Sequence, residues 1–193
     1  MTETLIVFDR SQFLLYDFKH GRSWQVGDVE NEDVAIPEDS CIVMIDNEKH
    51  RTNLCQAIVT GGFAMGSASD AVYTLGFDAV TKNAVESYIC NVLTELPPLP
   101  APRYMHQAII AKGRTGSWTL FVAGGKSNAS SWHDTVWSLD LLPYFKTGLK
   151  RTTQDGTTEA LTSEWQTCAP MQSARSNFAM IGLRNYIYVY GGI

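Results

Sequence analysis

The sequence predicts an all-β protein built from repeated four-stranded antiparallel sheets, and three observations carry that prediction. A hydrophobic run that ends in a glycine pair occurs three times, as AIVTGG at 57–62, LFVAGG at 120–125 and IYVYGG at 187–192. Short runs rich in Val, Ile, Tyr and Phe, bounded by Gly, Asn, Asp or Pro, fill most of the chain, as strands do. No segment shows the convincing 3.6-residue periodicity of an amphipathic helix.

Two further landmarks recur in the same order as the glycine pairs. A proline precedes an arginine by five residues at Pro98…Arg103 and at Pro170…Arg175, and an apolar run follows each arginine. An aromatic strand follows the first two glycine pairs, with Tyr73 at 12 and Trp137 at 13 residues after the first glycine. Because three independent landmarks recur in one order, they indicate a structural repeat rather than chance.

The repeat divides the chain into units. We expect strands at 41–46, 54–60, 71–77 and 86–94, then at 104–112, 118–123, 135–140 and 160–167, and finally at 177–183 and 186–190. The domain boundaries that follow are an N-terminal half-unit and linker at 1–40, repeats at 41–102 and 103–173, and the first half of a third at 174–193. The second repeat carries an insertion at 143–163. The segment 186–190 is apolar on both faces, which predicts burial between two sheets.

The repeated residues have structural roles in this interpretation. Each glycine pair ends a strand where the backbone turns sharply or approaches a neighbour closely. The landmark glycines are Gly61, Gly62, Gly124, Gly125, Gly191 and Gly192. We expect Trp165 and Tyr190 to fill the wedges between adjacent sheets. Arg103 and Arg175 are expected to bind loop carbonyls or a neighbouring carboxylate.

This order of a glycine pair, an aromatic strand, a late Trp and a Pro…Arg step resembles the kelch repeat. The resemblance covers about residues 41–193 and implies an incomplete β-propeller of about three blades that serves mainly as a protein-binding scaffold. Two departures stand out. The repeat spacings of 63 and 67 residues exceed the usual length of about 50, and Leu93 stands where the first unit should have its Trp.

A propeller needs about four to eight blades to close. Three explanations stay open: the chain belongs to a longer propeller, two copies associate, or another protein completes the ring. In each of them Gly191-Gly192-Ile193 leaves a strand edge that invites pairing.

Composition excludes several classes of function. The 15 basic and 20 acidic residues give a net charge of −5, which is unfavourable for general nucleic-acid binding. No apolar run approaches the length of about 20 residues of a membrane helix, and the start of the chain lacks the cationic region of a secretory signal. The cysteines fit no zinc template and are expected to be buried and reduced, so we expect a cytoplasmic protein. They are Cys41, Cys55, Cys90 and Cys168.

No metal, cofactor or catalytic site is predicted, since neither a phosphate-binding loop nor a nucleophile elbow occurs. An enzyme that uses the propeller's central funnel is the alternative function. A copper oxidase would draw on His106, His133 and Tyr104, and a sugar-acid isomerase on Arg103 and Arg175. A third hypothesis is that the protein is a structural part of a larger assembly. Our main hypothesis is a non-catalytic module that binds a protein partner through its loops.

Two loops are candidates for that binding. The polar loop 126–133 carries Trp132 and His133 at its end, and an exposed Trp is a common interface anchor. Burial of Trp132 against the sheet is the competing interpretation. The insertion 143–163 offers Lys146, Lys150 and Arg151 among several threonines, and it either contributes to binding as a mobile segment or is an idle spacer.

Overall fold

The computed structural model describes the larger part of the chain. The described residues are 4–9, 12–17, 22–26, 36–45, 55–82, 85–112, 117–145, 150–152, 158–160, 163–184 and 186–193. Within them the protein is all-β, with antiparallel sheets and a single short helix. The predicted fold class is therefore confirmed at the level of four-stranded antiparallel sheets.

Two of the sheets have four strands each and the same order. The first contains β4 (Cys41–Ile45), β5 (Cys55–Thr60), β8 (Val72–Lys82) and β9 (Val85–Glu95). The second contains β10 (Gln107–Lys112), β11 (Trp118–Ala123), β14 (Val136–Asp140) and β17 (Gln166–Thr167). We call them unit 1 and unit 2. Every neighbouring pair is antiparallel.

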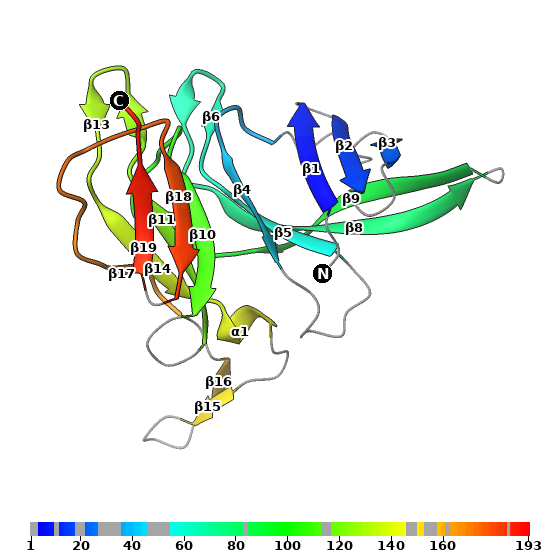
Figure 1. Cartoon of the computed structure of the whole chain (residues 1–193). Helices are drawn as coiled ribbons and strands as arrows, with labels where there is room; N and C mark the ends of the chain where they lie inside the picture. Colours follow the sequence, from blue (N-terminus) through cyan, green and yellow to red (C-terminus); the bar gives the residue numbers. More distant parts are fainter. Residues whose placement is uncertain are drawn as a thin grey trace.

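A two-stranded sheet, unit 3, follows in the chain. It consists of β18 (Ala179–Leu183) paired with β19 (Tyr186–Tyr190). The first strands of the three units lie side by side in the order β4, β10, β18, so the units stack like the blades of a propeller (Figure 1). The structure is thus propeller-like in the way its sheets are arranged.

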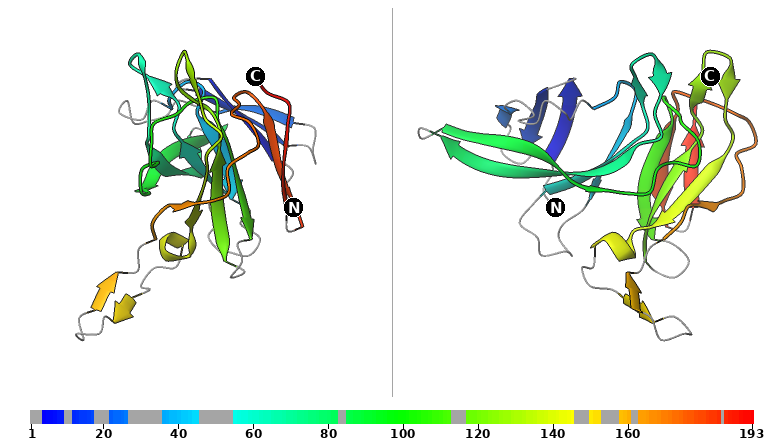
Figure 2. Two further views of the ribbon diagram at one scale, coloured as in Figure 1. Left: turned by 90° about the vertical axis from the view of Figure 1, so that its left-hand side faces the viewer. Right: turned by 180° about the vertical axis from the view of Figure 1, so that it is seen from behind.

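The N-terminal segment forms a three-stranded sheet of β1 (Thr4–Asp9), β2 (Gln12–Asp17) and β3 (Arg22–Val26). Strand β2 pairs with β1 on one side and with β3 on the other. Strand β3 lies against β9, and β8 and β9 extend as a long ribbon away from the stacked units (Figure 2).

The insertion within 143–163 begins with α1 (Leu142–Phe145) and contains a hairpin of β15 (Lys150–Thr152) and β16 (Thr158–Ala160). Its two ends are tied together, because the Tyr144 hydroxyl donates to the Ser163 carbonyl at 3.0 Å and the Ser163 hydroxyl donates to the Asp140 carbonyl at 2.6 Å. The insertion therefore leaves the register of unit 2 undisturbed. Of the strand expected at 160–167, β17 contains Gln166 and Thr167.

The core lies between the first two units. Strand β5 is buried on both faces, since Ala57, Ile58 and Val59 have no exposed surface. Leu120 and Leu139 are equally buried in unit 2. Trp165 packs against this core, and its indole N–H donates to the Pro97 carbonyl of unit 1 at 3.0 Å. The prediction that Trp165 fills the wedge between adjacent sheets is confirmed.

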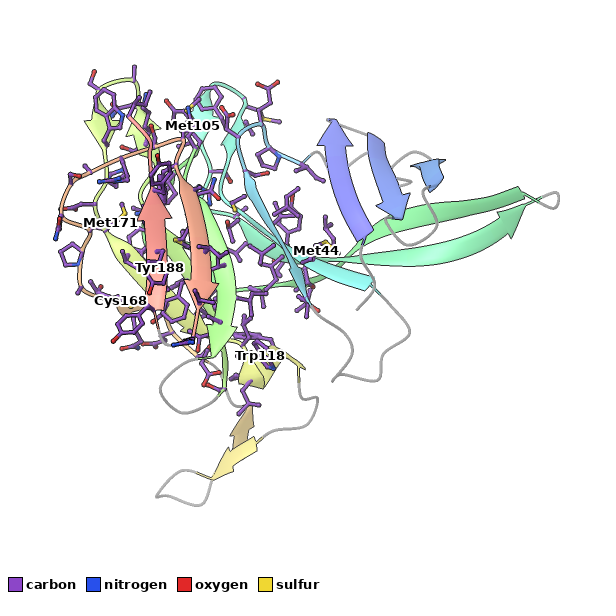
Figure 3. The ribbon with its side chains drawn as sticks, in the orientation of Figure 1. Met44, Met105, Trp118, Cys168, Met171 and Tyr188 are labelled. Carbon is purple, nitrogen blue, oxygen red and sulfur yellow. The ribbon has the colours of Figure 1, made fainter. Side chains whose placement is uncertain are left out.

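The corresponding prediction for 186–190 is wrong. Tyr190 is 84% exposed and Tyr188 is 52% exposed, so β19 is not sandwiched between sheets. Tyr188 lies on the outer surface of the stack (Figure 3). The physical reason is that no strand of the described part of the chain pairs with the outer edge of β19.

Candidate functional site

Each of the first two glycine pairs leads into a small hairpin at the same end of the stack. One hairpin is β6 (Phe63–Ala64) with β7 (Ser67–Ala68), and the other is β12 (Lys126–Asn128) with β13 (Ser131–Trp132). Strand β7 lies beside β12, so the two hairpins are neighbours, and both stand at the top of the stack (Figure 1). Sequence analysis did not predict these short hairpins.

The glycine pairs bend the chain because all six glycines have positive φ, between 55° and 112°. In the first two pairs the second glycine donates its N–H to the arginine of the next unit, from Gly62 to the Arg103 carbonyl at 2.8 Å and from Gly125 to the Arg175 carbonyl at 2.9 Å. An added Cβ at Gly61 would lie 2.5 Å from the Arg103 carbonyl oxygen. Glycine is therefore required for the close approach between units.

A second series of hydrogen bonds links the units at the same end. The Met105 N–H donates to the Asp39 carbonyl at 3.0 Å, and the Asn177 N–H donates to the Met105 carbonyl at 3.1 Å. All three residues have φ between 52° and 54°, the left-handed region that non-glycine residues seldom adopt. Met105 lies near the hairpin end of β10 (Figure 3). Asp and Asn tolerate this conformation, so two of the three positions carried a signal in the sequence.

Arg103 binds two residues that flank the β12–β13 hairpin. One terminal amino group donates to the Gly124 carbonyl at 2.8 Å and the other to the Thr135 hydroxyl at 3.1 Å. The guanidinium carbon lies 3.6 Å from the centre of the Trp137 ring. Burial lowers the pKa of Arg103 to about 9, so the side chain is still charged at neutral pH. The predicted binding of loop carbonyls is confirmed, and Arg175 shows it as well, at 2.9 Å from the Gly191 carbonyl.

The two hairpins and the neighbouring Tyr104 present a surface of aromatic and apolar side chains with one lysine, which we call the hairpin patch. It consists of Phe63, Met65, Tyr104, Lys126 and Trp132. Met65 is fully exposed at the tip of the first hairpin, with φ of 51° beside Gly66 at 82°. Two consecutive positive φ values are typical of the tight turns that connect hairpin strands.

Tyr104 joins the two halves of the hairpin patch. Its ring lies 5.1 Å from that of Phe63, and its backbone pairs with that of Lys126. The Lys126 amino group lies 4.5 Å from the centre of the Trp132 ring. Trp132 is 42% exposed, so the interpretation that it is tucked away against the sheet is incorrect for a large part of its surface. The lysine holds one orientation of the indole by a cation–π contact.

The other sequence candidates lie elsewhere. The His133 backbone donates to the Gly125 carbonyl at 3.0 Å and accepts from the Arg175 N–H at 3.1 Å, so it belongs to the links between units. Lys150 and Arg151 are part of β15, at the end of the molecule opposite the hairpins (Figure 1). Lys146 lies outside the described residues. The structure therefore does not bring Trp132 together with Lys150 or Arg151.

His106 is buried between units 1 and 2. Its Nε2 lies 2.7 Å from the Thr60 hydroxyl oxygen, and its Nδ1 is buried without a hydrogen-bond partner. Burial, together with the positive charge of Arg103, lowers the pKa of His106 to about 3. The same two causes lower the pKa of His133. Both imidazoles are therefore neutral at physiological pH.

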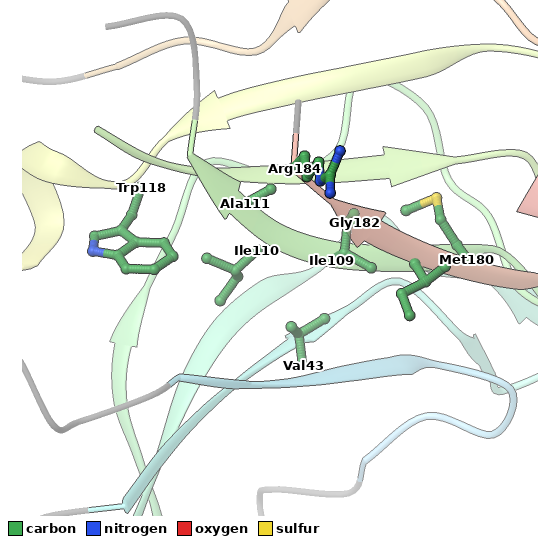
Figure 4. Close-up of a pocket in the computed structure, with 9 residues that line it drawn as sticks. Val43, Ile109, Ile110, Ala111, Trp118, Met180, Gly182 and Arg184 are labelled. Atoms are coloured by element: carbon green, nitrogen blue, oxygen red, sulfur yellow. The ribbon is translucent and has the colours of Figure 1, made fainter. Parts of the chain in front are cut away.

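A pocket of about 500 Å³ lies between the first strands of the three units (Figure 4). Its described lining is mainly apolar and comes from β4, β10 and β18, with Trp118 of β11 at one side. Arg184 is the ionisable group among these lining residues, which include no carboxylate, imidazole or thiol. General acid–base chemistry lacks the groups it needs in this pocket.

The potential metal ligands and the cysteines of the described residues form no cluster. No three His, Cys, Asp or Glu side chains of that part of the chain come close enough to hold a metal ion. Cys41 and Cys168 are free and half-buried, and burial raises the pKa of the Cys41 thiol to about 11. Among the described segments, none is a helix with the length and apolar composition to cross a membrane.

No model of a known protein family and no curated protein matches the chain. The chain is similar to the solved structure of YjhT, with a TM-score of 0.55 and 14% identity, over 94% of this chain and 45% of that one. It also matches a chain in the cryo-EM structure of RAG in complex with one melted RSS and one unmelted RSS. That match has a TM-score of 0.49 and 13% identity over 98% of this chain and 74% of that one. This chain thus spans less than half the length of YjhT, and the likeness to YjhT is one of fold alone.

Proposed function

We propose that this protein is a non-catalytic, cytoplasmic interaction module of the kelch β-propeller type, which binds a partner protein through the hairpin patch. In this proposal units 1 and 2 are two blades and unit 3 is the inner half of a third. The repeated glycine, aromatic and arginine positions support the kelch assignment, because they have equivalent hydrogen bonds in successive units.

The observation that carries the proposal is the exposure of Trp132 and Met65 on two adjacent hairpins. A Trp offers a large contact area at low entropic cost, which is why it is enriched among interface residues that dominate binding energy. Met adapts its shape to a partner surface. Lys126 already orients the indole, so little ordering remains to oppose association.

The hairpin patch is built on links between units rather than on a loose loop. Tyr104 and Lys126 exchange two backbone hydrogen bonds of 2.9 Å, and Phe63 exchanges two with Glu38, of 3.0 and 2.6 Å. Binding residues on such a supported scaffold keep their geometry in the free protein. The proposed partner therefore docks an apolar surface against a patch that is already formed.

The test is site-specific photo-crosslinking from position 65 in cells, followed by identification and affinity measurement of the crosslinked protein. Trp132→Ala should weaken binding of that protein by about 30-fold, or roughly 2 kcal/mol, the scale of an interface hot spot. Ser130→Ala, on the exposed turn of the same hairpin, is the matched control and should leave the affinity unchanged. Equal affinity of the Trp132→Ala variant would contradict the proposal, as would turnover of a small molecule by the pure protein.

A further inference from the structure

The two hairpins that carry the hairpin patch close with different turn chemistry. In β12–β13 the side-chain carbonyl of Asn128 accepts the Ser130 N–H at 2.9 Å, a local hydrogen bond that is common in turns. In β6–β7 the connecting residues are Met65 and Gly66, both with positive φ. The first position of such a turn favours Asn, Asp or Gly, and a methionine there costs about 1 kcal/mol. Formation of the turn therefore does not explain Met65.

Core packing does not explain this methionine either. The relative exposure of Met65 is 106%, so its side chain lies entirely in solvent. The other methionines of the described residues are half-buried, namely Met44, Met105, Met171 and Met180. A residue in a sparsely populated backbone conformation at an exposed tip indicates a role outside the fold.

The thioether distinguishes Met65 from an equally exposed aliphatic residue, because hydroperoxides oxidise it. The sulfur attacks one oxygen of hydrogen peroxide, and an S–O bond forms as the O–O bond breaks. The proton of the transferred oxygen passes to the departing hydroxide. The products are methionine sulfoxide and water, with sulfur oxidised and peroxide reduced by two electrons. Since Met65 is fully exposed, peroxide reaches its sulfur without any opening of the fold.

The thiols of the described residues are less open to the same reagent. Cys41 and Cys168 are half-buried. Burial also raises the pKa of the Cys41 thiol to about 11, so little of it is the thiolate that reacts with peroxides. Among the sulfur-containing side chains of the described residues, that of Met65 is therefore the most accessible to peroxide.

We propose that Met65 is a reversible oxidation site through which a hydroperoxide regulates binding at the hairpin patch. The regulatory part rests on the proposed function of that patch. The sulfoxide oxygen is a hydrogen-bond acceptor, and an apolar partner surface would bury it unpaired, which opposes association. In the free protein the same oxygen faces water, so the fold is unaffected. Methionine sulfoxide reductases restore the thioether and make the change reversible.

The modification site is tested on the purified protein with dilute hydrogen peroxide, followed over time by peptide mass mapping. Met65 should be converted at least about fivefold faster than the four half-buried methionines, because exposure controls access of the peroxide. Urea unfolding of the protein oxidised at Met65 should keep its midpoint. Conversion of Met65 at the rate of the half-buried methionines would overturn the proposal.

The regulatory part is tested with the partner protein identified by photo-crosslinking from position 65. Oxidation of Met65 should weaken the affinity for that protein about tenfold, and treatment with a methionine sulfoxide reductase should restore it. Met65→Gln introduces a polar side chain without peroxide and should weaken binding to a similar extent. Met65→Leu is the comparison variant, since it cannot be oxidised at this position. Peroxide should change its affinity less than about twofold relative to its own untreated form.

Equal losses of affinity on peroxide treatment of the unsubstituted and Met65→Leu proteins would place the sensitive group elsewhere and overturn the proposal. Unchanged affinity after full conversion of Met65 would do the same. If no protein is crosslinked from position 65, the proposed function fails and the regulatory part with it, while the oxidation rates still decide the modification site. If Trp132→Ala weakens binding but oxidation of Met65 does not, the proposed function stands and the regulation fails.

Discussion

Arg103 and Arg175 occupy equivalent places in successive units but have different surroundings. Arg103 is 1% exposed, bonded to Gly124 and Thr135 and covered by Trp137. Arg175 is bonded to Gly191, but it is only half-buried and its second amino group binds Ser173. The sequence landmark is the same in both, so the third strand of the unit, rather than the arginine itself, makes the site a buried one. Burial in this fold is a property of neighbouring strands.

The largest expected difference is between the two arginine-to-methionine variants. Arg103→Met removes two charge-assisted hydrogen bonds and a cation–π contact. The buried Gly124 carbonyl then loses the hydrogen bond that it accepts from Arg103. We expect a loss of about 4 kcal/mol in the free energy of unfolding, against about 1 kcal/mol for Arg175→Met. Urea unfolding with equal m values measures both. Similar losses would show that the third strand does not make the difference.

Substitution of Gly124 and of Gly191 compares the same two sites, because Arg103 binds the first of these glycines and Arg175 binds the second. Gly124→Ala forces positive φ on alanine and places its Cβ 2.6 Å from the Arg175 carbonyl oxygen, while Gly191→Ala forces positive φ alone, with nothing within 4 Å of the new Cβ. We expect losses of about 3 kcal/mol and about 1 kcal/mol respectively. Thermal unfolding of the two variants at one protein concentration is the measurement. A Gly124→Ala protein as stable as the Gly191→Ala protein would contradict the close packing of units 2 and 3.

A smaller effect should follow from a fall in pH from 6.5 to 5. His106 has its pKa lowered from about 6.5 in the unfolded chain to about 3 in the folded protein, so protons bind the unfolded state more tightly. Its contribution to stability is complete above pH 6.5 and is lost as the pH falls toward 3, at up to about 1.4 kcal/mol per pH unit.

His106→Phe provides the control for that pH dependence, because Phe178 stands at the equivalent position of unit 3. As the pH falls from 6.5 to 5, the free energy of unfolding of the protein with His106 should therefore decrease relative to that of the His106→Phe variant. Parallel stability curves over this range would mean that His106 is not buried as a neutral base.

The elements set by local landmarks could be predicted from the sequence. Strands β11 and β19 have the expected bounds, because glycine pairs and turn residues define their ends. Strand β8 runs on to Lys82, beyond the expected end at 77, because its ribbon with β9 continues past the stacked units. Exposure of Tyr190 could not be predicted, since the pattern of 186–190 reports which side chains suit a buried strand and not whether a neighbour is present.

The candidate site could be predicted only in part, because the sequence shows local features and not which segments lie side by side. Trp132 stood out as a single aromatic residue in a polar loop. The contact of Phe63 with Tyr104 joins residues of different units, and the exposure of Met65 follows from a two-residue turn in left-handed conformation. Neither the Phe63–Tyr104 contact nor the exposure of Met65 can be predicted from the hydrophobic periodicity of the sequence. Likewise, Lys146, Lys150 and Arg151 were grouped by charge, and charge alone does not place the insertion relative to the hairpins.

Amide hydrogen exchange of the six landmark glycines in the free protein tests the central claim most directly. If equivalent units stack and no strand of the described residues pairs with the outer edge of β19, the N–H groups of Gly61, Gly62, Gly124 and Gly125 should exchange slowly. Those of Gly191 and Gly192 should exchange at nearly the rate of an unfolded chain. Uniform protection of all three pairs, or fast exchange at the first two, would contradict the account.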